Sequence, residues 1–172
     1  MSAMSGRDEA DRDCVPRVQI DSIRMIKSSF NVGVNTESLS RSGRGQISGI
    51  VYAEIGGIPF PERQWSDLIV VVLSFWLESL GTLAAGSSRS TSLRFMDGPF
   101  RLDVHQNGER VHLSAIDSRQ GDTLVHEMDA ELKALYTATE AAAVQVLRAC
   151  SEKGWWSPDI DRLVQLSNQA TK

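Results

Sequence analysis

The chain is poor in the residues that hold small proteins together through covalent bonds or metal ions. It has 2 cysteines and 3 histidines in 172 residues. Cys14 falls in a polar stretch and Cys150 on an expected helix, so a structural disulfide is not expected and a reducing compartment is favoured. We therefore expect the fold to depend on an apolar core, which a chain of this length can bury.

The sequence also lacks the short motifs that mark the common enzyme classes. It contains no Walker loop, Rossmann glycine fingerprint, HExxH, CxxC or GxSxG. These absences count against the motif-marked enzymes, and no cofactor or metal is expected. The formal net charge of −4 argues against a nucleic-acid partner, which usually needs a basic face, and would suit a basic protein partner.

Long uninterrupted apolar runs are missing as well. The most apolar stretch, Trp65 to Gly86, contains Asp67 and Glu78, and inserting these carboxylates into a bilayer would be costly. The N-terminus has no apolar region of the kind found in signal peptides. The sequence thus predicts a cytoplasmic protein with no membrane-spanning helix.

The stretch from Trp65 to Gly86 is the one around which the rest of the chain is organised. Its apolar residues recur at steps of three and four and cover most of the circumference, which is typical of a buried helix. We expect this helix to start near Pro61 and to stop at Gly86, with Asp67 in a narrow polar seam. The apolar residues at helical spacing are Trp65, Leu68, Ile69, Val72, Phe75, Trp76, Leu80 and Leu83.

The chain before this helix predicts a tail followed by two strands. Residues 1–16 are charged, small and aperiodic, which is typical of a disordered tail, and residues 17–172 are expected to form a single domain. Val18–Val34 and Gln46–Ile55 alternate between apolar and polar residues, and a change of parity between Ile20 and Ile23 suggests a bulge or a break in the first of them. We expect these two strands to pair antiparallel across a polar loop, Asn35–Gly45.

Three further strands are expected after the helix. Ser92–Met96 is short, and Phe100–Gln106 with Glu109–Ile116 should form a hairpin. The turn is expected at Asn107-Gly108, because this dipeptide is a strong signal for a two-residue hairpin loop.

Polar residues on the outer side of this hairpin form the best candidate site. A turn centred on Asn107-Gly108 would place Asp103 beside His112 and His105 beside Arg110. Asp103 could then orient His112 as a general base, with His105 as a second acid or ligand, in a small hydrolase or transferase. The competing interpretation is an exposed strand face with ordinary charge pairs, since no nucleophile or third metal ligand is placed nearby.

Two helices are expected at the C-terminal end. Leu124–Lys153 shows helical periodicity, and Ser157-Pro158-Asp159 is a helix start with serine as the cap. The order of elements is therefore β-β-α-β-β-β-α-α. It predicts an α+β fold with an antiparallel sheet of about five strands, a buried central helix, and a long C-terminal helix packed on one face.

Several other polar or reactive positions have a functional and a structural interpretation. The loop at Arg41–Gly45 could hold a phosphate or a nucleic acid, but a flexible loop made soluble by its two arginines is favoured, since no aromatic residue interleaves with them. Cys150 could be a nucleophile, but its place on an apolar stripe favours a buried cysteine. Trp155-Trp156 could form a ligand platform, but the favoured interpretation is that they close the core where two helices meet, with one ring partly exposed.

Two fragments resemble a known group of proteins. They are Phe60-Pro61-Glu62-x-x-Trp65-x-Asp67 leading into VVVLSFW, and Phe95-Met96-Asp97-Gly98-Pro99. They resemble small uncharacterised bacterial α+β proteins, which are similar in size and layout to immunity proteins that neutralise toxins in interbacterial competition. The resemblance covers Gln46 to Pro158 and consists of turn and helix-start residues, so it implies a bacterial cytosolic binding protein but no functional residue.

Three functions remain open from the sequence. The first is a non-enzymatic binding protein, an immunity protein that binds a cognate toxin, with Arg110 and Trp156 as candidate partner-binding residues. The second is a small hydrolase or transferase that uses Asp103, His105 and His112. The third is a structural or assembly subunit, such as a homodimer, that associates through Trp156 and apolar edge strands.

Overall fold

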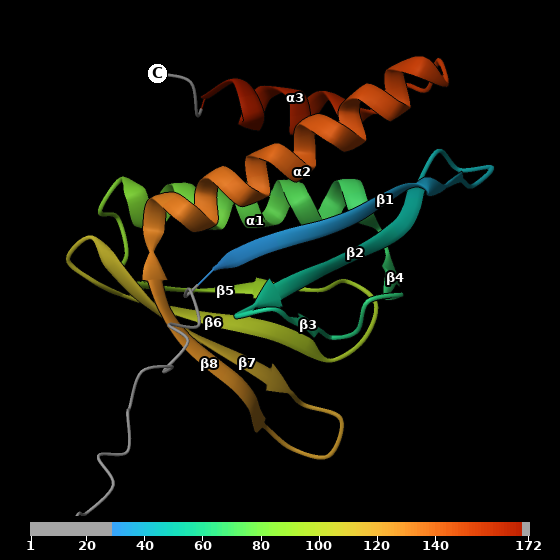
Figure 1. Cartoon of the computed structure of the whole chain (residues 1–172). Coiled ribbons are helices and arrows are strands. Elements are labelled where there is room, and N and C mark those ends of the chain that lie inside the picture. Colours follow the sequence, from blue (N-terminus) through green and yellow to red (C-terminus); the bar gives the residue numbers. More distant parts are fainter. Residues whose placement is uncertain (1–28, 170–172) are drawn as a thin grey trace, which may run out of the picture.

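The computed structural model describes residues 29–169, which form an α+β fold of two antiparallel sheets and three helices (Figure 1). The predicted α+β class is confirmed, although the strands number eight in two sheets where about five in one sheet were expected. The predicted tail, residues 1–16, and the first part of the predicted strand Val18–Val34 lie outside the described residues. In chain order the elements are β1 (Phe30–Arg41), β2 (Ile47–Ile55), β3 (Ile58–Phe60), β4 (Ser66–Asp67), α1 (Ile69–Ala84), β5 (Ser90–Arg94), β6 (Phe100–Asn107), β7 (Arg110–Asp117), β8 (Thr123–Glu131), α2 (Leu132–Glu152) and α3 (Pro158–Gln169).

The first sheet is built on β2, which pairs with β1 on one side and with β3 and β4 on the other. The predicted antiparallel pairing of the first two strands is confirmed. The polar loop predicted at Asn35–Gly45 is wrong, because β1 continues through it to Arg41 after a register shift between Asn35 and Ser40. The hydroxyl of Ser38 accepts the N–H of Ile50 at 2.8 Å, so polar side chains support the strand where apolar alternation is lost.

The central helix starts later than its apolar pattern predicts. α1 begins at Ile69, while Ser66 and Asp67 form β4 and pair with Ile50 and Gly49 of β2. The predicted start near Pro61 and the place of Asp67 in a polar seam are therefore wrong. Strand pairing with β2 overrides the helical periodicity of this segment.

Asp67 is instead a buried carboxylate, 3% exposed, that joins the two sheets. It accepts the backbone N–H of Leu68 at 2.6 Å and those of Met96 at 2.9 Å and Asp97 at 3.1 Å, in the turn after β5. The indole N–H of Trp65 donates to the same carboxylate at 3.3 Å. A buried carboxylate needs such donors to remain in an apolar environment.

The second sheet has the strand order β5-β6-β7-β8 and is antiparallel throughout. Its last strand, β8, occupies the first part of the long helix that was predicted at Leu124–Lys153, so this helix is shorter than expected and begins at Leu132. One face of the sheet is apolar and lies against the core. Its buried residues are Leu93, Leu102, Val104, Val111, Leu113, Ala115 and Ala130.

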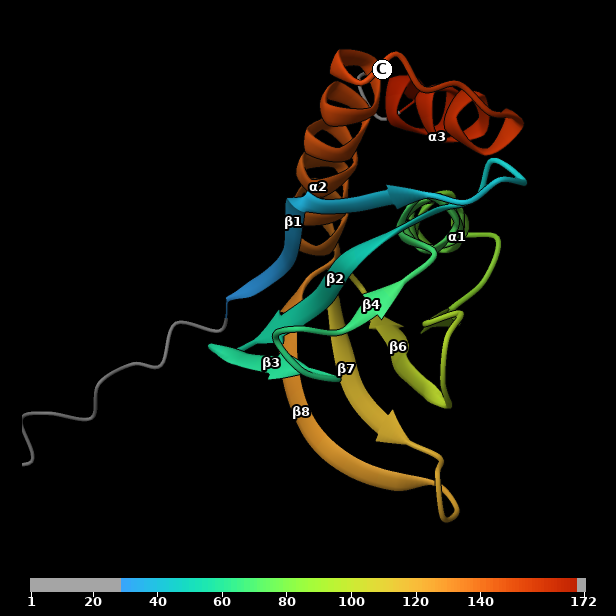
Figure 2. The same ribbon diagram turned by 90° about the vertical axis from the view of Figure 1, so that its right-hand side faces the viewer.

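The core lies between the sheets and the helices, as expected for a buried central helix. α1 contacts α2, α3, β2 and β5. Figure 2 shows it end-on below α3 and beside the lower part of α2, while β7 and β8 extend away from the helices. Trp76 of α1 is fully buried and its indole N–H donates to the carbonyl of Arg94 at 2.9 Å. Edge-to-face aromatic contacts continue this core between the sheets, through the pairs Trp76–Phe95, Phe60–Phe95, Phe60–Phe100 and Trp65–Phe100.

The C-terminal helices confirm the predicted helix start at Ser157, whose hydroxyl accepts the N–H of Ile160 at 3.3 Å. Trp155 packs against the core and Trp156 is 62% exposed, as the paired tryptophans predicted. Cys150 is buried and free, and burial raises the pKa of its thiol. None of the helices within residues 29–169 combines the length and the apolar character that crossing a membrane would require.

Candidate functional site

The candidate site lies on the face of the second sheet that points away from the core, called here the outer face. Its hairpin register differs from the predicted one by two residues. Asn107 pairs with Arg110, so the turn residues are Gly108 and Glu109, and Gly108 takes the first central position with a φ of 66°. Glycine tolerates this left-handed conformation, and a two-residue loop with glycine first is as favourable as one with glycine second.

The corrected register separates the catalytic pair that the sequence predicted. Asp103 lies opposite Ser114, and His112 lies opposite His105, so the predicted pairings of Asp103 with His112 and of His105 with Arg110 are wrong. The four residues still share the outer face, because a shift of two residues preserves the side to which each points.

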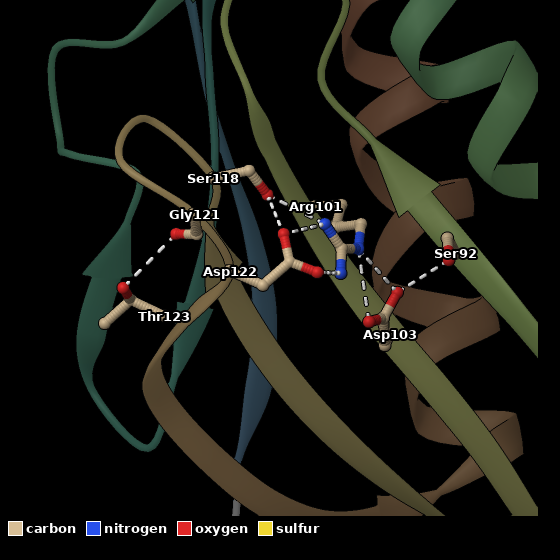
Figure 3. A network of polar contacts seen from close by, with 7 residues as sticks. All are labelled: Ser92, Arg101, Asp103, Ser118, Gly121, Asp122 and Thr123. Carbon is tan, nitrogen blue, oxygen red and sulfur yellow. Dashed lines mark hydrogen bonds and ion pairs between the residues drawn. The ribbon is translucent and has the colours of Figure 1, made fainter.

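The outer face is organised around Arg101, whose guanidinium lies between two carboxylates (Figure 3). Its Nε donates to Asp103 at 3.1 Å, and its two terminal nitrogens donate to both oxygens of Asp122 at 3.1 and 2.7 Å. The hydroxyl of Ser118 accepts from Arg101 at 2.8 Å and donates to Asp122 at 2.6 Å. Ser92 donates to Asp103 at 2.6 Å, so this network, called here the Arg101 clamp, runs from β5 to the loop before β8.

Protonation in the clamp follows these contacts. The hydrogen bonds from Arg101 and then from Ser118 lower the pKa of Asp122, and the same two carboxylates, Asp122 first and Asp103 second, raise the pKa of Arg101. The carboxylate of Asp122 and the guanidinium of Arg101 are therefore both ionised at any physiological pH. A planar guanidinium can bind two carboxylates in fixed directions, which a lysine could not do.

A second polar cluster surrounds His112. Its Nδ1 lies 2.8 Å from Asp129, and its Nε2 lies 3.4 Å from Glu127, both on β8. The hydrogen bond with Asp129 raises the pKa of His112, although partial burial of the ring acts in the opposite direction. His105, directly opposite on β6, is exposed.

The arrangement around His112 does not place a nucleophile next to a base. A serine hydrolase needs the histidine between a carboxylate and a hydroxyl, whereas both ring nitrogens of His112 face carboxylates. Among residues 29–169, no group of three or more His, Cys, Asp or Glu side chains is placed to hold a metal ion. The third histidine, His126, lies opposite Ala115 of β7 and points to the other side of the sheet.

Open depressions surround the loop between β7 and β8 at the end of the outer face. One of about 340 Å³ lies over Phe100, Arg101 and Asp122. A second, of about 220 Å³, has Phe60, Trp65 and Phe100 in its walls, together with Val125. Such hollows could receive side chains of a partner, since aromatic walls with a charged rim are common at protein interfaces.

The two predicted partner-binding residues lie in different regions. Arg110 begins β7 and is exposed on the outer face, opposite Asn107 and Glu131. Trp156 lies before α3, where its indole N–H donates to Asp161 at 3.1 Å and its carbonyl accepts from Arg41 at 3.1 Å. The structure therefore does not bring Arg110 and Trp156 together.

Sequence reasoning missed most of the residues that organise the outer face. The helix predicted at Leu124–Lys153 includes Glu127 and Asp129, which the structure places on β8, and Asp122 was not among the candidate residues. Arg101 and Asp103 could have been recognised, because residues two apart on a strand share a face. No family model matches the chain, and neither a curated protein nor a solved structure matches it. The class of protein is therefore defined by the fold and its outer face, an α+β protein with an ordered polar sheet surface.

Proposed function

We propose that this chain is a non-enzymatic binding protein that recognises a protein partner through the outer face of the β5–β8 sheet. The observation that supports this proposal is that two groups of charged side chains on the face, one around Arg101 and one around His112, contact one another. Arg101 contacts Asp103 and Asp122, and His112 contacts Asp129 and Glu127. Side chains that are ordered before binding lose little conformational entropy when a partner docks.

The same face is offered by a rigid scaffold. Strands β5, β6 and β7 are covered on the opposite side by the apolar core, whereas β8 buries Ala130 alone, so the backbone positions from which most outer side chains start are held by the core. Sites on strands are more exact than sites on flexible loops. Polar pairs that are already satisfied also favour recognition by complementary charge, which sets specificity and association rate.

Within this class, the function that we favour is that of an immunity protein which occludes a cognate toxin in the bacterial cytosol. The resemblance of Phe60–Asp67 and Phe95–Pro99 to bacterial α+β proteins of this kind supports it. In the structure these two segments meet, because Asp67 accepts the N–H groups of Met96 and Asp97. The fragments that carry the resemblance therefore stabilise the fold, and we expect the specificity for a toxin to lie on the outer face.

The proposal is tested by sequencing the genes beside this one and co-expressing the chain with any toxic domain that they encode. Wild type should restore growth and co-purify with that domain. Arg110→Glu should weaken both, because it reverses the charge of a side chain that we expect the partner to contact on the outer face. Arg148→Glu is the matched control, since Arg148 is exposed on α2, and it should protect as wild type does.

The outcome also separates binding from catalysis. A screen of hydrolase and transferase substrates should show no turnover by wild type. Turnover that disappears in His112→Gln would contradict the binding function and restore the enzyme hypothesis. Failure of wild type to protect, or equal loss of protection in Arg110→Glu and Arg148→Glu, would contradict the role of the outer face.

A further inference from the structure

β8 is an edge strand of the second sheet in the part of the chain that the structure describes. Within residues 29–169 its backbone pairs with β7 alone, and Ala130 is the one buried residue of its nine. The opposite edge strand, β5, has five residues and packs against α1. An unpaired strand edge presents a row of N–H and C=O groups that can pair with another chain.

The side chains of β8 define what kind of chain would fit. Glu127, Asp129 and Glu131 alternate along the strand and point to the outer face, and β8 has no lysine or arginine. The side chains of Glu127 and Asp129 are 56% and 63% exposed. Alternate residues on a strand are about 6.6 Å apart, so a paired strand would place its own alternate side chains next to these carboxylates.

A second copy of this chain does not fit the edge. Two antiparallel β8 strands related by a twofold axis at Glu127 would place that residue against itself, and an axis at Met128 would place Glu127 against Asp129 of the other copy. An axis at Asp129 would place Glu127 against Glu131 of the other copy. Like charges directly opposite each other destabilise strand pairing, so the carboxylates that protect the edge from self-association would favour a basic strand.

We propose that a protein partner adds an extended segment to β8 as a further strand, and that this segment carries lysine or arginine on alternate residues opposite Glu127, Asp129 and Glu131. This inference rests on the protein-binding function proposed above and names the chemistry of the partner. Main-chain hydrogen bonds would supply much of the affinity, and the alternating cations would fix register and direction.

The test uses a capped peptide of the length of β8 with lysine at every second position and threonine or valine between. Wild-type protein should bind it measurably in calorimetry. A peptide of the same composition with consecutive lysines, and one with N-methyl groups on alternate amides, should each bind about tenfold more weakly, because register or hydrogen bonds are lost.

Protein variants separate strand addition from simple charge attraction. Glu127→Lys combined with Glu131→Lys should weaken binding about tenfold or more, since attraction becomes repulsion. Glu37→Lys combined with Glu152→Lys makes the same change of net charge at exposed positions on β1 and α2, and should change binding less than about twofold at physiological salt.

Equal binding of the N-methylated peptide would overturn strand addition, as would equal losses in the two double variants or no binding to wild type. These failures can be distinguished from failure of the proposed function. If Glu127→Lys with Glu131→Lys still protects cells from the toxin, the partner does not use β8, while a binding function of the outer face remains supported.

Discussion

The surroundings of α1 and the outer face of the β5–β8 sheet use polar groups in opposite ways. Around α1, the few polar side chains stabilise the fold. Asp67 is 3% exposed and accepts the backbone N–H of Leu68, next to the first sheet, and that of Met96, next to the second. On the outer face, Arg101 and His112 hold neighbouring side chains that are open to solvent. Buried polar groups are costly to disturb, whereas exposed pairs contribute little to stability.

This difference separates stability from recognition within one small chain. Changes near α1 should lower the free energy of unfolding. Changes on the outer face should leave that free energy almost unaltered and change which partners bind. This separation is wrong if substitutions in the two regions lower the free energy of unfolding by similar amounts.

The largest expected effect is that of Trp76→Ala. Removal of this fully buried ring leaves a cavity and the carbonyl of Arg94 without its donor, and should cost about 3–5 kcal/mol. Denaturant unfolding measures this loss in the free energy of unfolding. Trp156→Ala is the control, because that ring is 62% exposed, and it should change stability by about 0.5 kcal/mol or less. An unchanged midpoint for Trp76→Ala would contradict the central place of α1.

Asp67→Ala should have the next largest effect. It leaves the N–H groups of Leu68, Met96 and Asp97 without their acceptor, with an expected cost of about 1–3 kcal/mol. Thermal unfolding of this variant can be compared with that of Asp97→Ala, which keeps the backbone donors. Equal stability of Asp67→Ala and wild type would show that water replaces the carboxylate and that the link between the sheets is weak.

Arg101→Met should change global stability by about 0–1 kcal/mol, because one partner in the clamp, Asp122, is 61% exposed. Its main effect should be local. The loop between Asp117 and Thr123 loses the guanidinium that holds Asp122 and Ser118, so its amides should exchange faster by mass spectrometry. A global loss of stability as large as that of Asp67→Ala would show that the Arg101 clamp stabilises the fold as the buried core does.

The smallest effect is a pH dependence due to His112. Its pKa in the folded protein is raised above the ordinary 6.5 by Asp129, so the native state favours the protonated ring. The resulting stabilisation is fully present below the unfolded pKa of 6.5 and is lost as pH rises through the folded pKa. His112→Gln should remove this dependence, as seen in unfolding curves from about pH 5 to about pH 9. An NMR titration of His112 in Asp129→Asn should show a lower pKa than wild type.

The sequence allowed the buried helix, its main core residue Trp76 and the alternation of β2 to be predicted, because these depend on apolar periodicity. It did not reveal β8. Leu124, Met128 and Leu132 are four residues apart, a spacing that suits one face of a helix and one face of a strand equally. The start of α2 has no side-chain cap on Glu131, so nothing local marks the change from strand to helix.

The candidate site was less predictable than the fold. The Asn107-Gly108 dipeptide indicated a hairpin correctly, but glycine takes the first turn position, and this one choice moved every cross-strand pair by two residues. The carboxylates around His112 lie on the strand that was not predicted. Since cross-strand contacts depend on register and on strand number, an error in either changes the chemistry that a sequence predicts for the face.

The hydrogen bonds of Asp67 also close a loop in the chain. The carboxylate and its two backbone donors, Met96 and Asp97, are 29 and 30 residues apart in the chain, and the whole of α1 lies between them. This closed loop contains the helix α1 and the buried Trp76, and the hydrogen bonds of Asp67 join its two ends. We expect it to be the cooperative unit that opens last in native-state hydrogen exchange, with β7 and the outer strand β8 opening earlier, because they extend away from the helices.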